Sequence, residues 1–164
     1  EVGKRFQSGE MFLPELQKAA DVFSAAMDII RPKLLETKSD VQPKGNVVIG
    51  TVKGDLHSIG KDLVATMLNV AGFKVTNLGV DIATFTFLEE AEKVNADVIA
   101  LSALLTTTMP AMETTVKAVK EAGMSVKTII GGAPVTQAFS DQIGADGYSA
   151  DAPGAVKLVK EIMT

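Results

Sequence analysis

The feature that most constrains the fold is a regular alternation of strand-like and helix-like patterns from Asn46 onward. Short apolar runs predict strands over residues 46–52, 73–78, 97–102, 127–131 and 146–148. Amphipathic runs between them predict helices over 60–71, 84–95, 109–122, 135–143 and 152–163. The strands at 97–102 and 127–131 are apolar throughout their middles, which is typical of strands covered on both faces. This pattern predicts an α/β domain with a doubly wound, five-stranded parallel sheet.

The first 45 residues have a different composition. Apolar residues recur at helical spacing over 10–36, with Pro14 suited to the first turn of a helix and Pro32 near its end. The polar stretch 36–45 contains Pro43 and Gly45 and is typical of a linker. We therefore expect a helical segment at 1–35, a linker at 36–45 and the α/β domain at 46–164.

Composition excludes several classes of function. The net charge of −4 provides no basic surface for nucleic acid, so we expect no nucleic-acid partner. The chain has no cysteine, which excludes disulfides, zinc–cysteine sites and thiol catalysis. No apolar run is long enough to span a bilayer and no signal peptide is visible, so we expect a cytoplasmic protein without a membrane partner.

The only histidine, His57, follows the first predicted strand in Asp55-Leu56-His57-Ser58-Ile59-Gly60. A carboxylate near an imidazole fixes its tautomer and raises its basicity, as partners of metal-bound histidines do. Asp55 is placed for that task, although it would also suit the cap of a turn. The arrangement suggests an imidazole aimed at a metal that no other side chain of the protein holds.

Two more strand ends have unusual sequences, the hydroxyl-rich stretch 102–108 and Gly131-Gly132-Ala133-Pro134. Because the carboxyl ends of parallel strands meet at one edge, these segments and His57 are expected to line one crevice. Glycines allow close approach of a ligand, and the helix that begins near Gly60 offers unpaired N–H groups. The crevice is suited to a long, partly polar ligand.

Common alternatives have poor support. The chain contains no Gly-x-Gly-x-x-Gly, and the stretch from Gly54 to Asp62 departs from a P-loop in spacing and in its last residue. A phosphate-accepting receiver domain would have an acidic residue where this chain has Ser102. No serine lies in a Gly-x-Ser-x-Gly elbow, so a hydrolase triad is unsupported.

Together the three strand ends resemble the cobalamin-binding signature Asp-x-His-x-x-Gly, Ser-x-Leu and Gly-Gly. Here 41 residues separate Gly60 from Ser102, and 26 residues separate Leu104 from Gly131, as in that family. The stretch from Phe6 to Leu16 is similar to the helical cap of methyl-transferring corrinoid proteins and of the methionine synthase cobalamin module. The resemblance implies a Rossmann-like (flavodoxin-like) domain with an N-terminal helical cap segment and cobalamin as cofactor.

The resemblance also implies roles for individual residues. His57 would be the lower ligand of cobalt, Asp55 would hydrogen-bond to His57, and Thr108 would complete this relay, unless it is only the N-cap of the next helix. Phe6, Leu13 and Leu16 would cover the upper face, unless they only form a helical core. The nucleotide tail would lie among the strand ends. The implied cofactor-binding set is Phe6, Leu13, Leu16, Asp55, His57, Ser58, Ile59, Gly60, Ser102, Leu104, Thr106, Gly131 and Gly132.

The implied function is that of a methyl carrier, inactive alone, between a donor-specific methyltransferase and a folate or thiol acceptor methyltransferase. A reductive activase is a further implied partner. The donor would be a methyl ether, methanol, a methylamine or a betaine, with an O-demethylase system as the first expectation. A cobalamin-binding sensor and the small subunit of a cobalamin-dependent mutase are the alternatives.

Family caps are usually helical bundles, whereas residues 1–35 supply only part of one. An apolar helix face left uncovered tends to be buried against a partner. We therefore expect homodimerisation through residues 1–35.

Overall fold

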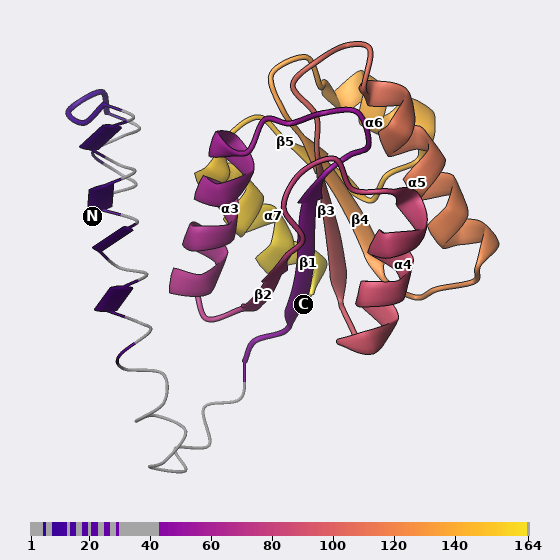
Figure 1. Cartoon of the computed structure of the whole chain (residues 1–164), viewed down its shortest axis with the longest axis horizontal. Helices are drawn as coiled ribbons and strands as arrows, with labels where there is room; N and C mark the ends of the chain where they lie inside the picture. Colours follow the sequence, from indigo (N-terminus) through magenta and orange to yellow (C-terminus); the bar gives the residue numbers. More distant parts are fainter. Residues whose placement is uncertain are drawn as a thin grey trace. The chain divides into compact units, whose positions relative to one another are not determined.

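The structure is a computed structural model that describes residue 5, residues 8–12, 14–15, 18–19, 21–22, 25–26, 29 and 43–163. The chain divides into two compact units, Glu1–Gln42 and Pro43–Thr164, each of which is considered by itself (Figure 1). In the first unit the described residues from Pro14 to Ile29 are helical. Phe6, Leu13 and Leu16 lie outside the described residues, so their expected role as cofactor cover stays a prediction.

Strands and helices alternate throughout the second unit, as the sequence predicted. The strands are β1 (Asn46–Thr51), β2 (Lys74–Asn77), β3 (Val98–Ser102), β4 (Lys127–Gly131) and β5 (Gly147–Ser149). The helices are α3 (Ile59–Val70), α4 (Thr84–Lys93), α5 (Met109–Glu121), α6 (Gln137–Ile143) and α7 (Ala152–Ile162). Among the helices that the structure describes, none is both long and apolar enough to cross a membrane.

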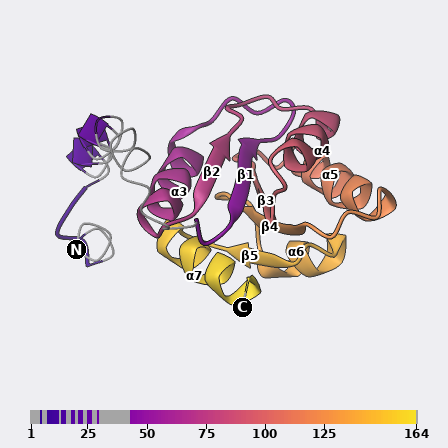
Figure 2. The same cartoon turned by 90° about the horizontal axis from the view of Figure 1, so that it is seen from below.

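All five strands are parallel and lie in the order β2-β1-β3-β4-β5, which confirms the predicted fold class. Helices cover both faces of the sheet, with α3 and α7 on one side and α4, α5 and α6 on the other (Figure 2). Each crossover from one strand to the next parallel strand therefore passes through a helix.

Two apolar cores hold these layers together. Alternate residues of a strand face opposite sides, so Val48 packs with the α4–α5–α6 layer and Val47 with the α3–α7 layer. Phe87 of α4 and Leu68 of α3 are fully buried, one in each core. Burial of each such side chain stabilises the fold by about 1.5–3 kcal/mol relative to exposure.

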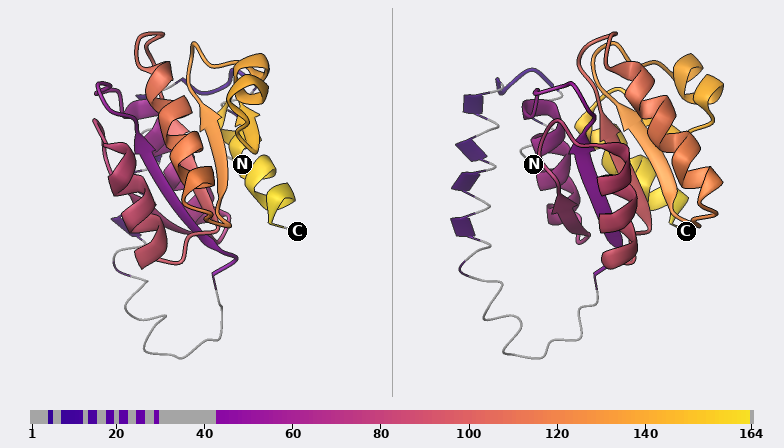
Figure 3. Two further views of the ribbon diagram at one scale, coloured as in Figure 1. Left: turned by 90° about the vertical axis from the view of Figure 1, so that its right-hand side faces the viewer. Right: turned by 45° about the vertical axis from the view of Figure 1, so that its right-hand side comes forward.

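The register of the sheet aligns the carboxyl ends of its strands. Thr51 pairs with Ser102, Ser102 with Gly131, and Gly131 with Ser149. The loops that follow β1, β3 and β4 consequently gather at one end of the domain (Figure 3). These loops contain the residues that the sequence predicted to line a crevice.

Candidate functional site

The loop between β1 and α3 holds Asp55 and His57. Gly54 has φ +86°, a conformation that favours glycine, and the N–H of Asp55 donates to the carbonyl of Val52 at 3.1 Å. The buried hydroxyl of Thr51 donates to the carbonyl of His57 at 2.8 Å. Thr51, the last residue of β1, therefore fixes the backbone of His57.

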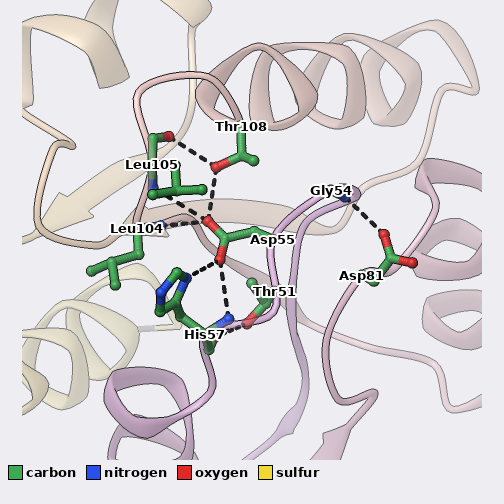
Figure 4. Close-up of polar contacts among 8 residues, drawn as sticks. All are labelled: Thr51, Gly54, Asp55, His57, Asp81, Leu104, Leu105 and Thr108. Atoms are coloured by element: carbon green, nitrogen blue, oxygen red, sulfur yellow. Dashed lines mark hydrogen bonds and ion pairs between the residues drawn. The ribbon is translucent and has the colours of Figure 1, made fainter.

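Asp55 is fully buried and accepts hydrogen bonds from two loops (Figure 4). Its Oδ1 accepts from the backbone N–H of His57 at 3.1 Å and contacts the His57 ring. Its Oδ2 accepts from the N–H of Leu104 at 2.7 Å, from the N–H of Leu105 at 3.3 Å and from the Thr108 hydroxyl at 2.8 Å. These hydrogen bonds offset the free-energy cost of removing the carboxylate from water.

The charge of Asp55 follows from this environment. Burial by itself raises the pKa of the carboxyl group, but the N–H of Leu104, both nitrogen contacts from His57 and the Thr108 hydroxyl together lower that pKa far below its usual range. Asp55 is therefore ionised at neutral pH and acts only as an acceptor.

The His57 ring is held by Asp55 on one side and open on the other. Its Nδ1 lies 2.7 Å from Asp55 Oδ1, while 52% of the side chain is exposed. Because the carboxylate can only accept, Nδ1 has the proton in the neutral ring and the lone pair is left on Nε2. Figure 4 shows that the second ring nitrogen faces away from Asp55. This is the geometry of an imidazole ligand with a carboxylate behind it.

Thr108 supports Asp55 and not the helix that follows. It occupies the N-cap position of α5, yet its side chain makes no capping hydrogen bond. Its hydroxyl lies 2.8 Å from Asp55 Oδ2 and 2.9 Å from the carbonyl of Leu105. The alternative of Thr108 as a simple N-cap is therefore wrong for its side chain, and the structure joins Asp55, His57 and Thr108 in one chain of contacts.

Exposed apolar side chains lie on the loops after β1 and β3 and at the start of α3. Leu56 is 72% exposed, Ile59 51%, and Leu104 and Leu105 more than 40% each. Exposed leucine and isoleucine side chains near an exposed imidazole suit a large, flat and largely apolar ligand. These residues would therefore suit a large, flat cofactor such as the corrinoid that the sequence resemblance implies.

The glycines of the signature differ in what they do. A Cβ on Gly60 would meet no atom within 4 Å, so this position is open to a ligand. Gly132 has φ +132°, and a Cβ there would lie 1.9 Å from the carbonyl oxygen of Ala103. A Cβ on Gly131 would lie 3.1 Å from the Ser149 carbonyl oxygen. The space left at Gly132 is thus filled by the chain itself, and the fold requires this glycine whether or not a ligand approaches.

The remaining predicted residues lie at the same edge. Ser58 is the N-cap residue of α3 without a capping side-chain bond, Ser102 ends β3, and Thr106 is exposed in the loop after β3. Thr51 and the backbone amide of Leu105 also belong to the site and were not predicted from the sequence. Within the described part of the chain no cluster of three metal-binding side chains occurs, which leaves His57 as a lone candidate ligand.

The depressed pKa of Asp55 gives a testable dependence of stability on pH. In the unfolded chain an aspartate carboxyl group has a pKa of about 3.9, and in the folded protein the pKa of Asp55 is lower. The stability that ionised Asp55 contributes is therefore present above the unfolded pKa and is lost as the pH falls toward the folded pKa. We expect Asp55→Asn to lower the free energy of unfolding of the apo-protein by about 1–3 kcal/mol at pH 7, because its amide nitrogen faces the N–H of either His57 or Leu104, donor against donor. Urea unfolding between about pH 6 and 2 should show a shallower decline in the variant.

Asp141→Asn is the matched control, because Asp141 is exposed on α6 and its side chain accepts from the Gln137 amide at 2.8 Å. This variant should follow the wild-type pH profile. Parallel pH profiles for Asp55→Asn and the wild type would contradict the assignment of acid sensitivity to Asp55.

Comparison with known proteins adds a family to this geometry. Residues 45–157 match the family model described as B12 binding domain, and residues 1–31 match a second model with the same description. The chain is 48% identical over 165 residues to trimethylamine corrinoid protein 1 of Methanosarcina acetivorans, covering 99% of this chain and 76% of that one. It is 46% identical over 165 residues to dimethylamine corrinoid protein 3 of Methanosarcina mazei, covering 99% of this chain and 98% of that one.

A solved structure of a cobalamin protein complex also contains a similar chain. The methanol:cobalamin methyltransferase complex of Methanosarcina barkeri contains a chain that is 29% identical, with a TM-score of 0.85, over 99% of this chain and 62% of that chain. The match to the family model covers most of the α/β domain, and the similarity to the corrinoid proteins covers both units. The chain therefore belongs to the B12-binding corrinoid proteins and is a cobalamin-binding methyl carrier of methyltransferase systems.

Proposed function

We propose that this chain shuttles a methyl group between a methylamine methyltransferase and a folate or thiol acceptor methyltransferase, with His57 as the lower ligand of cobalt. The observation behind the ligand assignment is the geometry of His57, whose Nδ1 is fixed by a buried carboxylate while the ring is half exposed. When bound, cobalamin supplies a cobalt that accepts and donates the methyl group. The chain itself then has the task of holding, orienting and shielding this cofactor.

The protein's own residues divide that task. Asp55 orients the His57 ring, and Thr108 with the amides of Leu104 and Leu105 holds Asp55 ionised. Nδ1 of His57 faces the Asp55 carboxylate, so Nε2 is the ring nitrogen left to bind cobalt. The nucleotide tail would enter beside Gly60, near Ser58, Ile59, Ser102, Leu104, Thr106, Gly131 and Gly132. Phe6, Leu13 and Leu16 would shield the upper face.

The relatives support a methylamine as the donor. Trimethylamine and dimethylamine corrinoid proteins match this chain at 48% and 46% identity, which favours a methylamine over the methyl ether expected from the sequence. The two identities are close, so trimethylamine and dimethylamine are both candidate donors. A reductive activase and a homodimer through residues 1–35 stay predictions.

Reconstitution with methylamine and methanol methyltransferases tests which methyl donor the chain serves. The cobalamin-loaded chain should accept methyl groups from trimethylamine or dimethylamine in the presence of the corresponding Methanosarcina methyltransferase. The change in the visible spectrum of the cofactor measures this transfer. Methanol with its own methyltransferase is the matched comparison. Efficient transfer from methanol, with none from either amine, would overturn the donor assignment and leave the carrier function in place.

Gly60→Ala separates cofactor binding from folding. Gly60 is exposed in the first turn of α3, and a Cβ there meets nothing, so the substitution should raise the stability of the apo-protein by up to about 1 kcal/mol. If the nucleotide tail approaches this backbone, the added methyl group costs about 1–3 kcal/mol of binding free energy, or about fivefold to 150-fold in Kd. Titration with hydroxocobalamin and urea unfolding measure the two effects. Unchanged cobalamin affinity would place the tail away from Gly60.

A further inference from the structure

We propose that Asp81, in the loop between β2 and α4, is a positioning residue that holds the β1–α3 loop so that His57 is presented to cobalt. The inference rests on the proposed role of His57 as the lower ligand. Asp81 lies four residues beyond the end of β2 and was not singled out by the sequence. Its side chain points toward Gly54, away from the His57 ring (Figure 4).

Asp81 makes contacts to three consecutive residues of the neighbouring loop. Its Oδ1 accepts from the backbone N–H of Gly54 at 2.8 Å, and its Oδ2 lies 2.9 Å from the Lys53 Nζ. Its own N–H donates to the carbonyl of Asp55 at 2.9 Å. Asp81 therefore fixes the backbone on both sides of the peptide bond that joins Gly54 to Asp55.

The backbone of Asp81 is itself in an uncommon conformation. Its φ is +58°, in the left-handed region, which non-glycine residues rarely adopt and which Asp and Asn tolerate better than most. Gly54, which it contacts, also has a positive φ of +86°. Two left-handed residues from separate loops thus meet at one hydrogen bond, and the strain persists because the contacts around Asp81 hold it.

Backbone pairing extends this contact. Thr51 N–H donates to the Gly79 carbonyl and Ile82 N–H to the Thr51 carbonyl, each at 3.0 Å, and Val52 forms a parallel bridge with Ile82. The β2–α4 loop therefore continues the pairing of β1 beyond its end. Asp81 lies between Gly79 and Ile82 in this segment, and its own contacts reach the residues that follow Val52.

Asp55 is consequently held from two sides. The β3–α5 loop binds its side chain through Leu104 and Thr108, and Asp81 binds its backbone carbonyl. The orientation of the His57 ring depends on Asp55 Oδ1, so a shift of the Asp55 backbone moves the ring. Asp81 contacts residues 53–55 and points away from the His57 ring, so it acts through the loop (Figure 4).

The ion pair with Lys53 is the minor part of this arrangement. The Lys53 side chain is 63% exposed and that of Asp81 41%, and exposed pairs are screened by solvent. The bond to the Gly54 N–H is the contact that fixes the loop. Asp81→Asn keeps an acceptor for that N–H and tolerates the left-handed backbone, whereas Asp81→Gly keeps the backbone conformation and removes the acceptor.

The test uses the full chain loaded with cobalamin in the Co(II) state. Asp81→Gly should lower cobalamin affinity about tenfold and reduce the fraction of cobalt whose electron paramagnetic resonance (EPR) spectrum shows histidine nitrogen, because partners of ligating residues typically contribute that much. Asp81→Asn and Lys53→Met should stay within about threefold of the wild type in affinity, since each keeps the bond to Gly54. In the apo-protein, the amides of Asp55 and His57 should exchange with deuterium faster in Asp81→Gly.

Asp146→Gly is the matched control. Asp146 makes the same kind of contacts at the opposite edge of the sheet, with the Lys127 Nζ at 3.0 Å and the Thr128 N–H at 2.8 Å. Its loss should lower stability and leave histidine ligation and the Asp55 and His57 amides unchanged.

Three results would overturn the inference. Histidine ligation and affinity in Asp81→Gly equal to the wild type would remove the role of Asp81 and leave the role of His57 intact. Equal effects of Asp81→Gly and Asp146→Gly would reduce Asp81 to a general stabiliser. A wild-type spectrum without histidine nitrogen would overturn the lower-ligand proposal and this inference with it.

Discussion

Replacing His57 with alanine is expected to remove protein nitrogen from the lower face of cobalt and to weaken cobalamin binding by about a hundredfold or more. Loss of a residue that only supports a metal ligand already costs about tenfold to a hundredfold in affinity, so loss of the ligand costs at least as much. Titration with hydroxocobalamin measures the affinity, and the EPR spectrum of the Co(II) form measures the ligation.

The fold should survive this substitution. The His57 side chain is 52% exposed, and Asp55 keeps the N–H of His57, the N–H of Leu104 and the Thr108 hydroxyl as donors. We expect the free energy of unfolding of the apo-protein to change by less than about 1 kcal/mol. Added imidazole should restore nitrogen ligation in the variant. A His57→Ala protein with wild-type affinity and spectrum would contradict the ligand assignment.

Replacing Gly132 with alanine is expected to have the largest effect on stability. A Cβ at this position would lie 1.9 Å from the Ala103 carbonyl oxygen, and the φ of +132° is unfavourable for any residue with a side chain. The left-handed backbone costs about 1–2 kcal/mol, and relief of the overlap costs about 1–3 kcal/mol more. Urea unfolding of the apo-protein should show the loss directly.

Gly123→Ala is the matched control for this prediction. Gly123 has φ +65°, and a Cβ there would meet nothing within 4 Å, so the variant reports the cost of backbone conformation without a clash. We expect Gly132→Ala to be less stable than Gly123→Ala by at least about 1 kcal/mol. Equal stability of the two variants would show that the loop at Ala103 moves aside at little cost. It would contradict the claim that the fold requires glycine at position 132.

The fold could be predicted closely because local patterns and tertiary structure agree. The apolar run at 97–102 became β3 at Val98–Ser102, and the helix expected at 60–71 became α3 at Ile59–Val70. The boundaries that differ have local causes. The helix expected from residue 135 begins at Gln137, because the Thr136 side chain caps it by accepting from the Phe139 N–H.

The site was predictable only where side chains provide the contacts. The pairing of Asp55 with His57 could be inferred from their spacing, and Thr108 from the resemblance to the cobalamin family. The donors to Asp55 from Leu104 and Leu105 are backbone N–H groups, which leave no signature in the side-chain sequence. The left-handed conformation of Asp81 and the filled space beside Gly132 depend on contacts between separate loops, so sequence spacing does not reveal them.

The most direct test of the account is the EPR spectrum of the Co(II) protein made with ¹⁵N-labelled histidine. His57 is the only histidine in the chain, so the label reports on this residue alone. We predict that the nitrogen superhyperfine triplet of the unlabelled protein becomes a doublet in the labelled protein. A triplet that persists after labelling would mean that the nucleotide base of the cofactor still binds cobalt, and would contradict the assignment of His57 as the lower ligand.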